Sequence, residues 1–294
     1  INSNVFKIET YNEKYVLKIY NNKRNNIDRF YNETKFLEFL SKCKFRNVPR
    51  IIKTNQKENW ILISWIEGKK IYQINKHVCI ELVNFLVRLQ DFRQSSLAKE
   101  LPLASDTYLN LNGFVFAIKD RLVLLLKRQQ ELININKELA FKLKDLIEKI
   151  KCEISNLITF SEVNKIDLNS IFPEKNRIIS QSDVGFHNII FKDNKAHFID
   201  FEYAGWDDPG KLFCDLILQP DHNIPMKYID LLDLFVENYI FKINYQKDRL
   251  LFMLKLSRLK WGLIILNPLI NNQEFSNQEL LDLLENKIKK SKIY

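Results

Sequence analysis

Two short apolar runs on either side of a polar turn constrain the fold of this chain more than any other feature. Residues 189–191 and 196–199 are largely apolar, and residues 192–195 between them are Lys-Asp-Asn-Lys. Short apolar runs that flank a turn rich in Asp and Asn are typical of a β-hairpin. The sequence therefore predicts that the chain reverses direction within residues 192–195.

The register of this hairpin decides which polar side chains meet at its open end. If residues 193–195 form the loop, Lys192 pairs with Ala196, and counting outward places Asn188 opposite Asp200. Directly opposed residues in a hairpin lie within reach of each other's side chains. An amide oxygen and a carboxylate in that position suit a hard divalent cation such as Mg²⁺. We therefore predict that Asn188 and Asp200 are metal ligands.

Asp183 lies in the segment just before the hairpin, so its carboxylate is expected near the same open end. A second carboxylate beside a cation is able to accept the proton of a hydroxyl group, which is the layout of a phosphoryl-transfer site. We interpret Asp183 as the catalytic base. His187 is interpreted as a loop residue, since it is adjacent to Asn188 and adjacent side chains generally point in different directions.

These residues resemble the signature of the aminoglycoside phosphotransferase and choline kinase superfamily, which contains small-molecule relatives of the protein kinases. The family pattern His-x-Asp-x-x-x-x-Asn, followed by a hairpin and Ile-Asp-Phe, is matched at Asp183, Asn188 and residues 199–201. The resemblance implies an α+β, bilobal, protein-kinase-like fold, with a small antiparallel-sheet N-lobe containing one helix and a mainly helical C-lobe. It also implies an enzyme that uses ATP or GTP with Mg²⁺ to phosphorylate a hydroxyl group of a small molecule.

The chain departs from the family pattern at two positions. Gln181 stands where the family has His, a residue that stabilises the catalytic loop of kinases without taking part in proton transfer. The family sequence Asp-Pro-x-x-Asp-Leu is also altered, because Asp208-Pro209 is followed by Asp215 one helical turn later. We expect Asp215 still to stabilise the catalytic loop. The missing His is the basis of an alternative from another class, a catalytically silent nucleotide-binding regulator.

A lysine and a glutamate in the first part of the chain are expected to form an ion pair. Lys18 lies within the apolar run of residues 15–20, where a lysine is costly unless it is paired or its ammonium group reaches water. Glu33 lies on the same face of the predicted helix 28–40 as its leucines, so its carboxylate points toward the core and requires a cation. The family resemblance implies that this pair places the lysine against the nucleotide phosphates.

The resemblance implies further contacts with the nucleotide. Backbone groups of Ser64 and Ile66 correspond to the hinge segment that meets the adenine base. Ser3 and Asn4 correspond to the end of the phosphate-binding loop, and the glycines of that loop would lie before Ile1. These four residues join Lys18 and Glu33 as predicted nucleotide-binding residues.

The predicted elements divide the chain into two domains. Residues 1–66 read as strand, strand, helix, strand and strand, which predicts a nucleotide-binding N-lobe. Residues 67–294 are mainly helical and are predicted to form the C-lobe with the catalytic loop and the acceptor site. The helices expected there cover residues 75–95, 112–158 with a break near 133–136, 210–218, 226–243, 246–266 and 277–290.

The acceptor is the least constrained part of the prediction. Candidate acceptor residues are Glu202, Trp206, Ser105, Arg258 and Lys260. Aminoglycoside sites usually need many acidic side chains, and the C-terminal region is not conspicuously acidic. We therefore expect a sugar or sugar-acid type of metabolite, with choline, ethanolamine or an aminoglycoside as alternatives. A protein substrate is disfavoured, because the segment after Asp200 leaves little room for an activation loop.

Composition bounds the partners and the compartment. The formal net charge of +9 is spread along the chain, without a basic tract interleaved with aromatic residues, so no nucleic-acid partner is expected. The four cysteines are scattered and lack metal-type spacing, which favours a reduced, cytoplasmic protein. No apolar run is long enough to span a bilayer. We expect a monomer or a homodimer that acts on a small-molecule acceptor.

Overall fold

The computed structural model describes residues 3–21, 28–71, 73–219 and 224–270, apart from the side chains of residues 269 and 270. The chain forms two compact units. The first comprises residues 1–107, 173–217 and 222–243, and the second comprises residues 108–172, 218–221 and 244–294. The boundary at residue 66, which the sequence predicts from its elements, stays a prediction.

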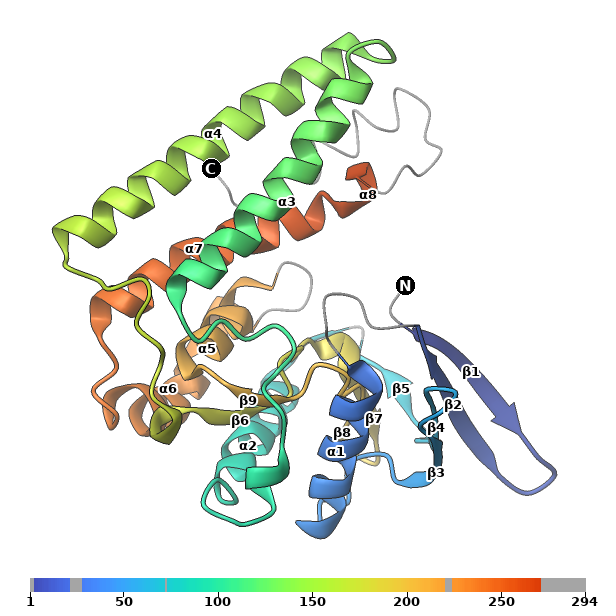
Figure 1. The fold of residues 1–294 in the computed structure, drawn as a ribbon. Coiled ribbons are helices and arrows are strands. Elements are labelled where there is room, and N and C mark those ends of the chain that lie inside the picture. The colour runs from blue at the N-terminus through green and yellow to red at the C-terminus, as the bar shows by residue number, and fades with distance from the viewer. Residues whose placement is uncertain (1–2, 22–27, 72, 220–223, 271–294) are drawn as a thin grey trace. The chain divides into compact units, whose positions relative to one another are not determined.

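A four-stranded antiparallel sheet opens the first unit, with the strand order β1-β2-β4-β3 (Figure 1). Its strands are β1 (Ser3–Glu9), β2 (Lys14–Tyr20), β3 (Ile51–Asn55) and β4 (Trp60–Ser64). The helix α1 (Arg29–Lys42) lies between β2 and β3 in the chain. The predicted order of strand, strand, helix, strand and strand is therefore confirmed.

The helix α1 presents one face to the core, as its sequence pattern predicts. Its first turn is capped by Asp28, whose side chain accepts a hydrogen bond from the backbone N–H of Tyr31. Glu33, Leu37 and Leu40 are all buried. A carboxylate on this apolar face must find a donor or a cation within the protein, because burial of an unpaired charge is costly.

Short strands and helices complete the first unit. A three-stranded sheet contains β5 (Lys69–Lys70), β7 (Ile189–Lys192) and β8 (Lys195–Phe198), and a two-stranded ribbon contains β6 (Ile178–Ser180) and β9 (Gly205–Asp207). The helices are α2 (Lys76–Gln90) and α5 (Pro209–Leu218). Where the sequence predicts one helix over residues 226–243, the structure has three consecutive helical segments of different kinds. They are a 3₁₀ segment (Met226–Leu232), α6 (Asp233–Val236) and a π segment (Glu237–Phe241).

The hairpin of β7 and β8 is present, but the predicted register is wrong by one residue. Lys192 pairs with Lys195, so Ala196 is not its partner. The loop contains only Asp193 and Asn194, whose φ angles of 48° and 62° are both in the left-handed region. A two-residue turn with two positive φ angles is the type I′ turn that fits the twist of a hairpin. The residue opposite Asn188 is consequently the one before Asp200.

Aromatic packing fixes the chain on both sides of this hairpin. The ring of Phe201 stacks on Phe36 of α1 with a centroid distance of 5.3 Å, and the ring of Phe198 stacks on Phe85 of α2 at 3.9 Å. All four rings are buried. Asp200, which lies between Phe198 and Phe201 in the chain, is thus attached to a rigid part of the core.

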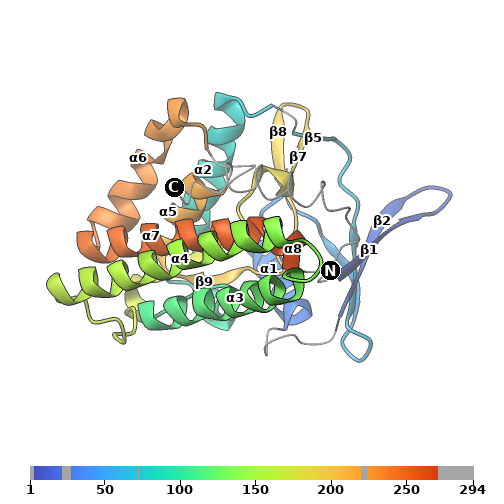
Figure 2. The ribbon, with the colours of Figure 1, turned by 90° about the horizontal axis from the view of Figure 1, so that it is seen from above.

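The second unit is helical. It contains α3 (Leu111–Leu132), α4 (Lys137–Val163), α7 (Lys247–Ile265) and α8 (Asn267–Ile270), and α3, α4 and α7 lie side by side (Figure 2). The predicted break near residues 133–136 is confirmed, and the Asn136 side chain caps α4 by accepting from the N–H of Leu139. The predicted helix 277–290 lies outside the described residues. Within the described part of the chain, every helix is too short or too polar to cross a bilayer.

Candidate active site

Lys18 and Glu33 form the buried ion pair that the sequence predicts. The Nζ atom of Lys18, in the middle of β2, lies 2.6 Å from Oε2 of Glu33 on α1. Lys18 is 5% exposed and Glu33 is fully buried. Because neither group has water to solvate it, each depends on the other for charge compensation.

Two further donors fix the carboxylate of Glu33. The hydroxyl group of Tyr20, which also lies on β2, donates a hydrogen bond to Oε2. The backbone N–H of Phe201 donates to Oε1 at 3.3 Å. Glu33 therefore connects the first sheet to the segment that follows the hairpin, and Tyr20 is a contributor that the sequence interpretation missed. Its alternation with Lys18 along β2 was the available signal, since residues i and i+2 share a face of a strand.

Lys18 also contacts Asp200. Its Nζ atom lies 2.8 Å from Oδ1 of Asp200, which has a φ angle of 65°. A non-glycine residue in this left-handed conformation is uncommon, and such residues cluster at functional sites. Burial by itself would lower the pKa of Lys18, but the carboxylates of Glu33 and Asp200 outweigh it and raise the pKa overall. Lys18 is therefore a permanent cation at neutral pH.

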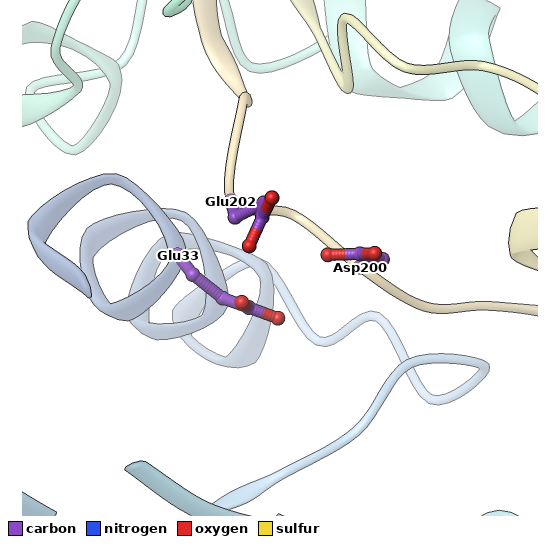
Figure 3. A group of neighbouring side chains, drawn as sticks. All are labelled: Glu33, Asp200 and Glu202. Carbon is purple, nitrogen blue, oxygen red and sulfur yellow. The ribbon is translucent and has the colours of Figure 1, made fainter. Parts of the chain in front are cut away.

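A third carboxylate, Glu202, lies beside this pair. Oxygen atoms of Glu33, Asp200 and Glu202 are all within 4.8 Å of one another, and Figure 3 shows these side chains converging from α1 and from the segment after β8. Glu202 is buried and lies 3.8 Å from the Nε atom of Arg29. Lys18 and Arg29 supply two positive charges against three carboxylates, so the group has an excess of negative charge.

The carboxylate of Asp200 and the side-chain amide oxygen of Asn188 are suited to a hard divalent cation. Asp200 has a partly exposed side chain, and carboxylate and amide oxygens are the ligands that Mg²⁺ prefers. The backbone carbonyl of Asn188 accepts a hydrogen bond from the N–H of Ile199 at 3.0 Å, which places Asn188 next to the residue that precedes Asp200. The Nδ2 atom of Asn188 donates within its own loop, so its amide oxygen is the atom suited to a metal.

Asp183 and Asn188 belong to one compact loop. The Nδ2 atom of Asn188 donates to Oδ2 of Asp183 and to the Asp183 carbonyl, in each case at 3.1 Å. The Nε2 atom of His187 lies 3.2 Å from the same Oδ2 atom. The expectation that His187 and Asn188 point in different directions is therefore wrong. A short 3₁₀ turn over Phe186–Asn188 lets both side chains reach Asp183.

These contacts keep Asp183 ionised. Burial alone would raise the pKa of Asp183, but the hydrogen bonds and charge of His187 and the hydrogen bond from Asn188 lower it overall. The Asp183 side chain nevertheless remains one-third exposed, at 33%. An ionised carboxylate that is both oriented by neighbours and accessible is able to accept a proton from an incoming hydroxyl group.

Gln181 connects this loop to the segment of Asp200. Its Nε2 atom donates to the carbonyl of Ile199 at 2.8 Å and to the carbonyl of Asp200 at 3.4 Å. Gln181 is 1% exposed, so these hydrogen bonds are shielded from water. The glutamine at the position of the family histidine therefore connects the loop of Asp183 to the segment of Asp200.

A buried lysine lies beneath the same loop. The Nζ atom of Lys211, on α5, lies 3.0 Å from Asp215, 3.2 Å from Asp207 and 3.3 Å from Oγ of Ser182. Burial by itself would lower the pKa of Lys211, but the two carboxylates raise it well above its usual range. Asp215 thus stabilises the loop through Lys211. The i, i+4 spacing of Lys211 and Asp215 on α5 was a signal for part of this cluster.

Of the predicted nucleotide and acceptor residues, two lie beside Glu202. The Oγ atom of Ser3 donates to Oε2 of Glu202 at 3.4 Å, and Asn4 is the neighbouring residue on β1. The Oγ atom of Ser105 lies 3.4 Å from the carbonyl of Glu202 and accepts a hydrogen bond from Asn32 at 2.8 Å. The structure therefore brings Ser3 and Ser105 together around Glu202.

The other predicted residues lie elsewhere on the two units. The N–H of Ser64 is already donated to the carbonyl of Arg50, so Ile66, just past β4, is the better-placed hinge candidate. Trp206 lies on β9 and donates its indole N–H to the carbonyl of Ala98. Arg258 is exposed and Lys260 is buried on α7 in the second unit, and their part in acceptor binding stays a prediction.

Known proteins share the sequence pattern and the fold of this chain. Residues 1–217 match the sequence profile of the phosphotransferase enzyme family. No curated protein sequence matches the chain significantly. Three solved structures with the same fold are ADP-bound aminoglycoside phosphotransferase APH(2'')-Ib, ethanolamine kinase from Plasmodium vivax, and spectinomycin phosphotransferase APH(9)-Ia.

The likeness to these structures extends along almost the whole chain, although the sequences have diverged. The TM-scores are 0.56, 0.61 and 0.61, at 14%, 16% and 11% identity respectively. The alignments cover 99%, 97% and 99% of this chain, and 94%, 79% and 89% of the other chains. The predicted α+β fold of aminoglycoside phosphotransferases and choline kinases is therefore confirmed.

Proposed function

Because this chain belongs to the phosphotransferase enzyme family, we propose that the cluster around Lys18, Asp183 and Asp200 is where it phosphorylates its acceptor. The protein is a small-molecule kinase, and the group it phosphorylates is a hydroxyl. The single observation that carries the assignment of the site is the double contact of Lys18 with Glu33 and Asp200, at 2.6 and 2.8 Å.

The nucleotide is bound by the first sheet and the segment after β4 in this proposal. Lys18, oriented by Glu33, contacts the phosphates of ATP or GTP, because an ammonium group that never loses its proton is a constant counter-charge for them. Ser3 and Asn4 lie at the start of β1, close enough to Glu202 to contribute to the same region. Backbone groups at Ile66, with Ser64 beside it, contact the base.

Asp200 and Asn188 hold Mg²⁺ in this scheme, and the cation supplies charge neutralisation for the phosphates. Asp200 is oriented for this by Lys18, by the core packing of Phe201 and by the hydrogen bond from Gln181 to its carbonyl. Glu202 adds negative charge beside the metal ligand or contacts the acceptor.

Asp183 accepts the proton of the acceptor hydroxyl and orients the attacking oxygen. Support for this role comes from its lowered pKa, its partial exposure and its place in one loop with Asn188. Positioning and charge neutralisation account for most of the catalysis in phosphoryl transfer, so a base held by His187 and Asn188 matters mainly for orientation.

The acceptor that we propose is a sugar or a sugar acid. Support comes from charge, since the C-terminal region is not conspicuously acidic, whereas a polycationic aminoglycoside needs several acidic side chains. Choline or ethanolamine is the second candidate, and the likeness to an ethanolamine kinase structure is the observation that favours it. Trp206, Ser105, Arg258 and Lys260 remain the residues proposed to contact the acceptor.

A panel of hydroxylated metabolites, assayed for ADP or GDP release with Mg²⁺, tests this proposal. Sugars, sugar acids, choline, ethanolamine and aminoglycosides form its five groups. We expect one group to accelerate nucleotide turnover over the background hydrolysis. Binding of Mg²⁺-ATP without acceleration by any group would favour the silent regulator, which the connections made by Gln181 argue against.

A further inference from the structure

A groove on the first unit is lined by none of the residues assigned to the nucleotide phosphates, the metal or the proton transfer, namely Lys18, Glu33, Asp183, Asn188 and Asp200. It shares Trp206 with the residues proposed to contact the acceptor. It has a volume of about 760 Å³, which is within the range of small-molecule sites. Its lining residues lie after α2, before β6 and in β9. We call it the basic groove, and the lining residues considered below are Arg93, Lys99, Leu103, Lys175, Arg177 and Trp206.

The basic groove has a strong excess of positive charge. Arg93, Lys99, Lys175 and Arg177 line it, and Glu174 is the one carboxylate among its lining residues. Among the residues that the structure describes, no carboxylate lies within 4.0 Å of a charged nitrogen of Arg93, Lys99 or Lys175. A concave surface with three such cations attracts anions, because its positive side chains outnumber its one carboxylate.

Arg93 is the best-defined cation of the groove. Its Nη2 atom donates to the carbonyl of Lys175 at 2.7 Å, which fixes the guanidinium group against the segment that leads to Arg177. Its Nε atom is buried without a hydrogen-bond partner in the described structure. Burial lowers the pKa of Arg93, and the charged form therefore carries a desolvation cost that a bound anion would offset.

One side of the basic groove is apolar. Two hydrogen bonds fix Trp206. Its indole N–H donates to the carbonyl of Ala98 at 2.9 Å, and its backbone N–H donates to the carbonyl of Pro102 at 2.8 Å. Leu103 forms an isolated parallel β-bridge with Trp206, and its side chain is 45% exposed. An immobilised indole next to an exposed leucine offers a flat apolar surface for a ring.

We propose that the basic groove binds the phosphate monoester of a ring-bearing small molecule. The guanidinium groups of Arg93 and Arg177 contact the phosphate oxygens, for which the planar fork of an arginine is well matched. Lys99 and Lys175 add charge at the rim, and Trp206 contacts the ring. The proposal does not depend on the phosphoryl-transfer function assigned to Asp183.

Occupancy of the groove would stabilise the strands that lead to the catalytic loop. Arg177 directly precedes β6, which pairs with β9 through Ile179 and Trp206. The chain continues from β6 through Ser180 to Asp183. A ligand that contacts both Arg177 and Trp206 therefore binds both strands of this ribbon, and thermal stability should rise with ligand concentration.

Isothermal titration with glucose 6-phosphate, inorganic phosphate and glucose tests the proposal on the full chain. We expect the tightest binding for glucose 6-phosphate, weaker binding for inorganic phosphate, and no binding of glucose that depends on the groove arginines. Arg93→Gln and Arg177→Gln should each weaken glucose 6-phosphate binding by about tenfold or more, as loss of a charge-assisted phosphate contact does. Arg46→Gln, at an exposed arginine outside the groove, is the matched control and should bind as the wild type does.

Two further variants keep the test decisive. If Arg93→Gln or Arg177→Gln fails to fold, the double variant Lys99→Gln/Lys175→Gln removes two exposed cations of the groove and should still weaken binding. Asp200→Asn reports on the phosphoryl-transfer site and should leave glucose 6-phosphate binding unchanged. Absence of saturable binding, retention of full affinity in the groove variants, or loss of affinity in Asp200→Asn would overturn the proposal.

Discussion

Lys18 and Asp200 are 182 residues apart in the chain, and their side chains form an ion pair of 2.8 Å. Lys18 comes from a strand of the first sheet, whereas Asp200 follows the hairpin of β7 and β8. Glu33 bonds to both segments, through Lys18 and through the N–H of Phe201. The ion pair of Lys18 and Asp200 is therefore also a long-range contact that holds the first sheet against the hairpin.

Tyr20→Phe tests the orientation of Glu33. Removal of the phenol hydroxyl deletes one hydrogen bond to a buried carboxylate, which should lower the free energy of unfolding by about 1.5–3 kcal/mol. We also expect a lower kcat/KM for the nucleotide, because Lys18 is less firmly held. Urea denaturation and steady-state kinetics measure the two effects. Tyr11→Phe, at a fully exposed tyrosine, is the control, and equal behaviour of the two variants would contradict the role of Tyr20.

Lys211→Met should destabilise the protein strongly. It leaves the buried carboxylates of Asp207 and Asp215 without their cation, which typically costs about 3–5 kcal/mol. Lys142→Met, which breaks an ion pair on the surface of α4, should cost about 1 kcal/mol or less. Chemical denaturation of both variants gives the comparison, and similar losses in the two would show that the Lys211 cluster is not stabilising.

Ser182→Ala separates the effect of Lys211 on catalysis from its effect on stability. The substitution removes the hydroxyl that Lys211 contacts at 3.3 Å, next to Asp183, and leaves both carboxylate contacts in place. We expect kcat to fall several-fold while KM for the nucleotide changes little, and the unfolding free energy to fall by about 1.5–3 kcal/mol, less than in Lys211→Met. A variant with unchanged kcat would limit Lys211 to a structural role.

The cysteines offer a test of the fold that needs no substrate. Cys152 is exposed on α4, whereas Cys43, Cys79 and Cys214 are buried. Burial raises the pKa of the Cys79 thiol to about 11, so this thiol stays protonated and unreactive near pH 8. With a thiol-specific reagent at pH 8 we expect one fast-reacting thiol in the native protein and four after denaturation. Rapid reaction of two or more native thiols would contradict the described packing.

The turn of the hairpin can be tested by its backbone conformation. Asn194 has a φ angle of 62°, which Gly adopts freely and a β-branched residue does not. Asn194→Gly should keep or slightly raise stability, whereas Asn194→Val should lower it by about 1–2 kcal/mol. Thermal denaturation of the pair measures the difference, and a valine variant as stable as the glycine variant would argue against a type I′ turn.

The sequence was sufficient to predict the order of strands and helix along the first part of the chain and the Lys18–Glu33 pair. Both depend on strong local rules, because a charged residue on an apolar strand or helix face requires a partner. The hairpin register could not be derived with the same security. A two-residue and a three-residue loop both fit residues 192–195, and only the positive φ angles of Asp193 and Asn194 distinguish them.

Contacts made through tertiary packing were beyond the sequence. Gln181 donates a hydrogen bond to the carbonyl of Asp200, and the pairing of β6 with β9 brings the two residues together. The sequence does not show this pairing, so Gln181 could be interpreted only as the replacement of the family histidine. The contact of His187 with Asp183 depends on a single 3₁₀ turn, which is too short to leave a periodic pattern. Trp206 was predicted as an acceptor residue, which stays a prediction, and its place in the lining of the basic groove could not be derived from the sequence.

The most direct test of the catalytic assignment compares the wild type with Asp183→Asn in the acceptor panel. Once an acceptor is found, Asp183→Asn should lower kcat by about 10³-fold, because the oriented proton acceptor is lost. Binding of Mg²⁺-ATP, measured by the same thermal shift in both proteins, should be unchanged. Near-normal turnover by Asp183→Asn on the acceptor would contradict the account, since the carboxylate on which it depends would then be dispensable.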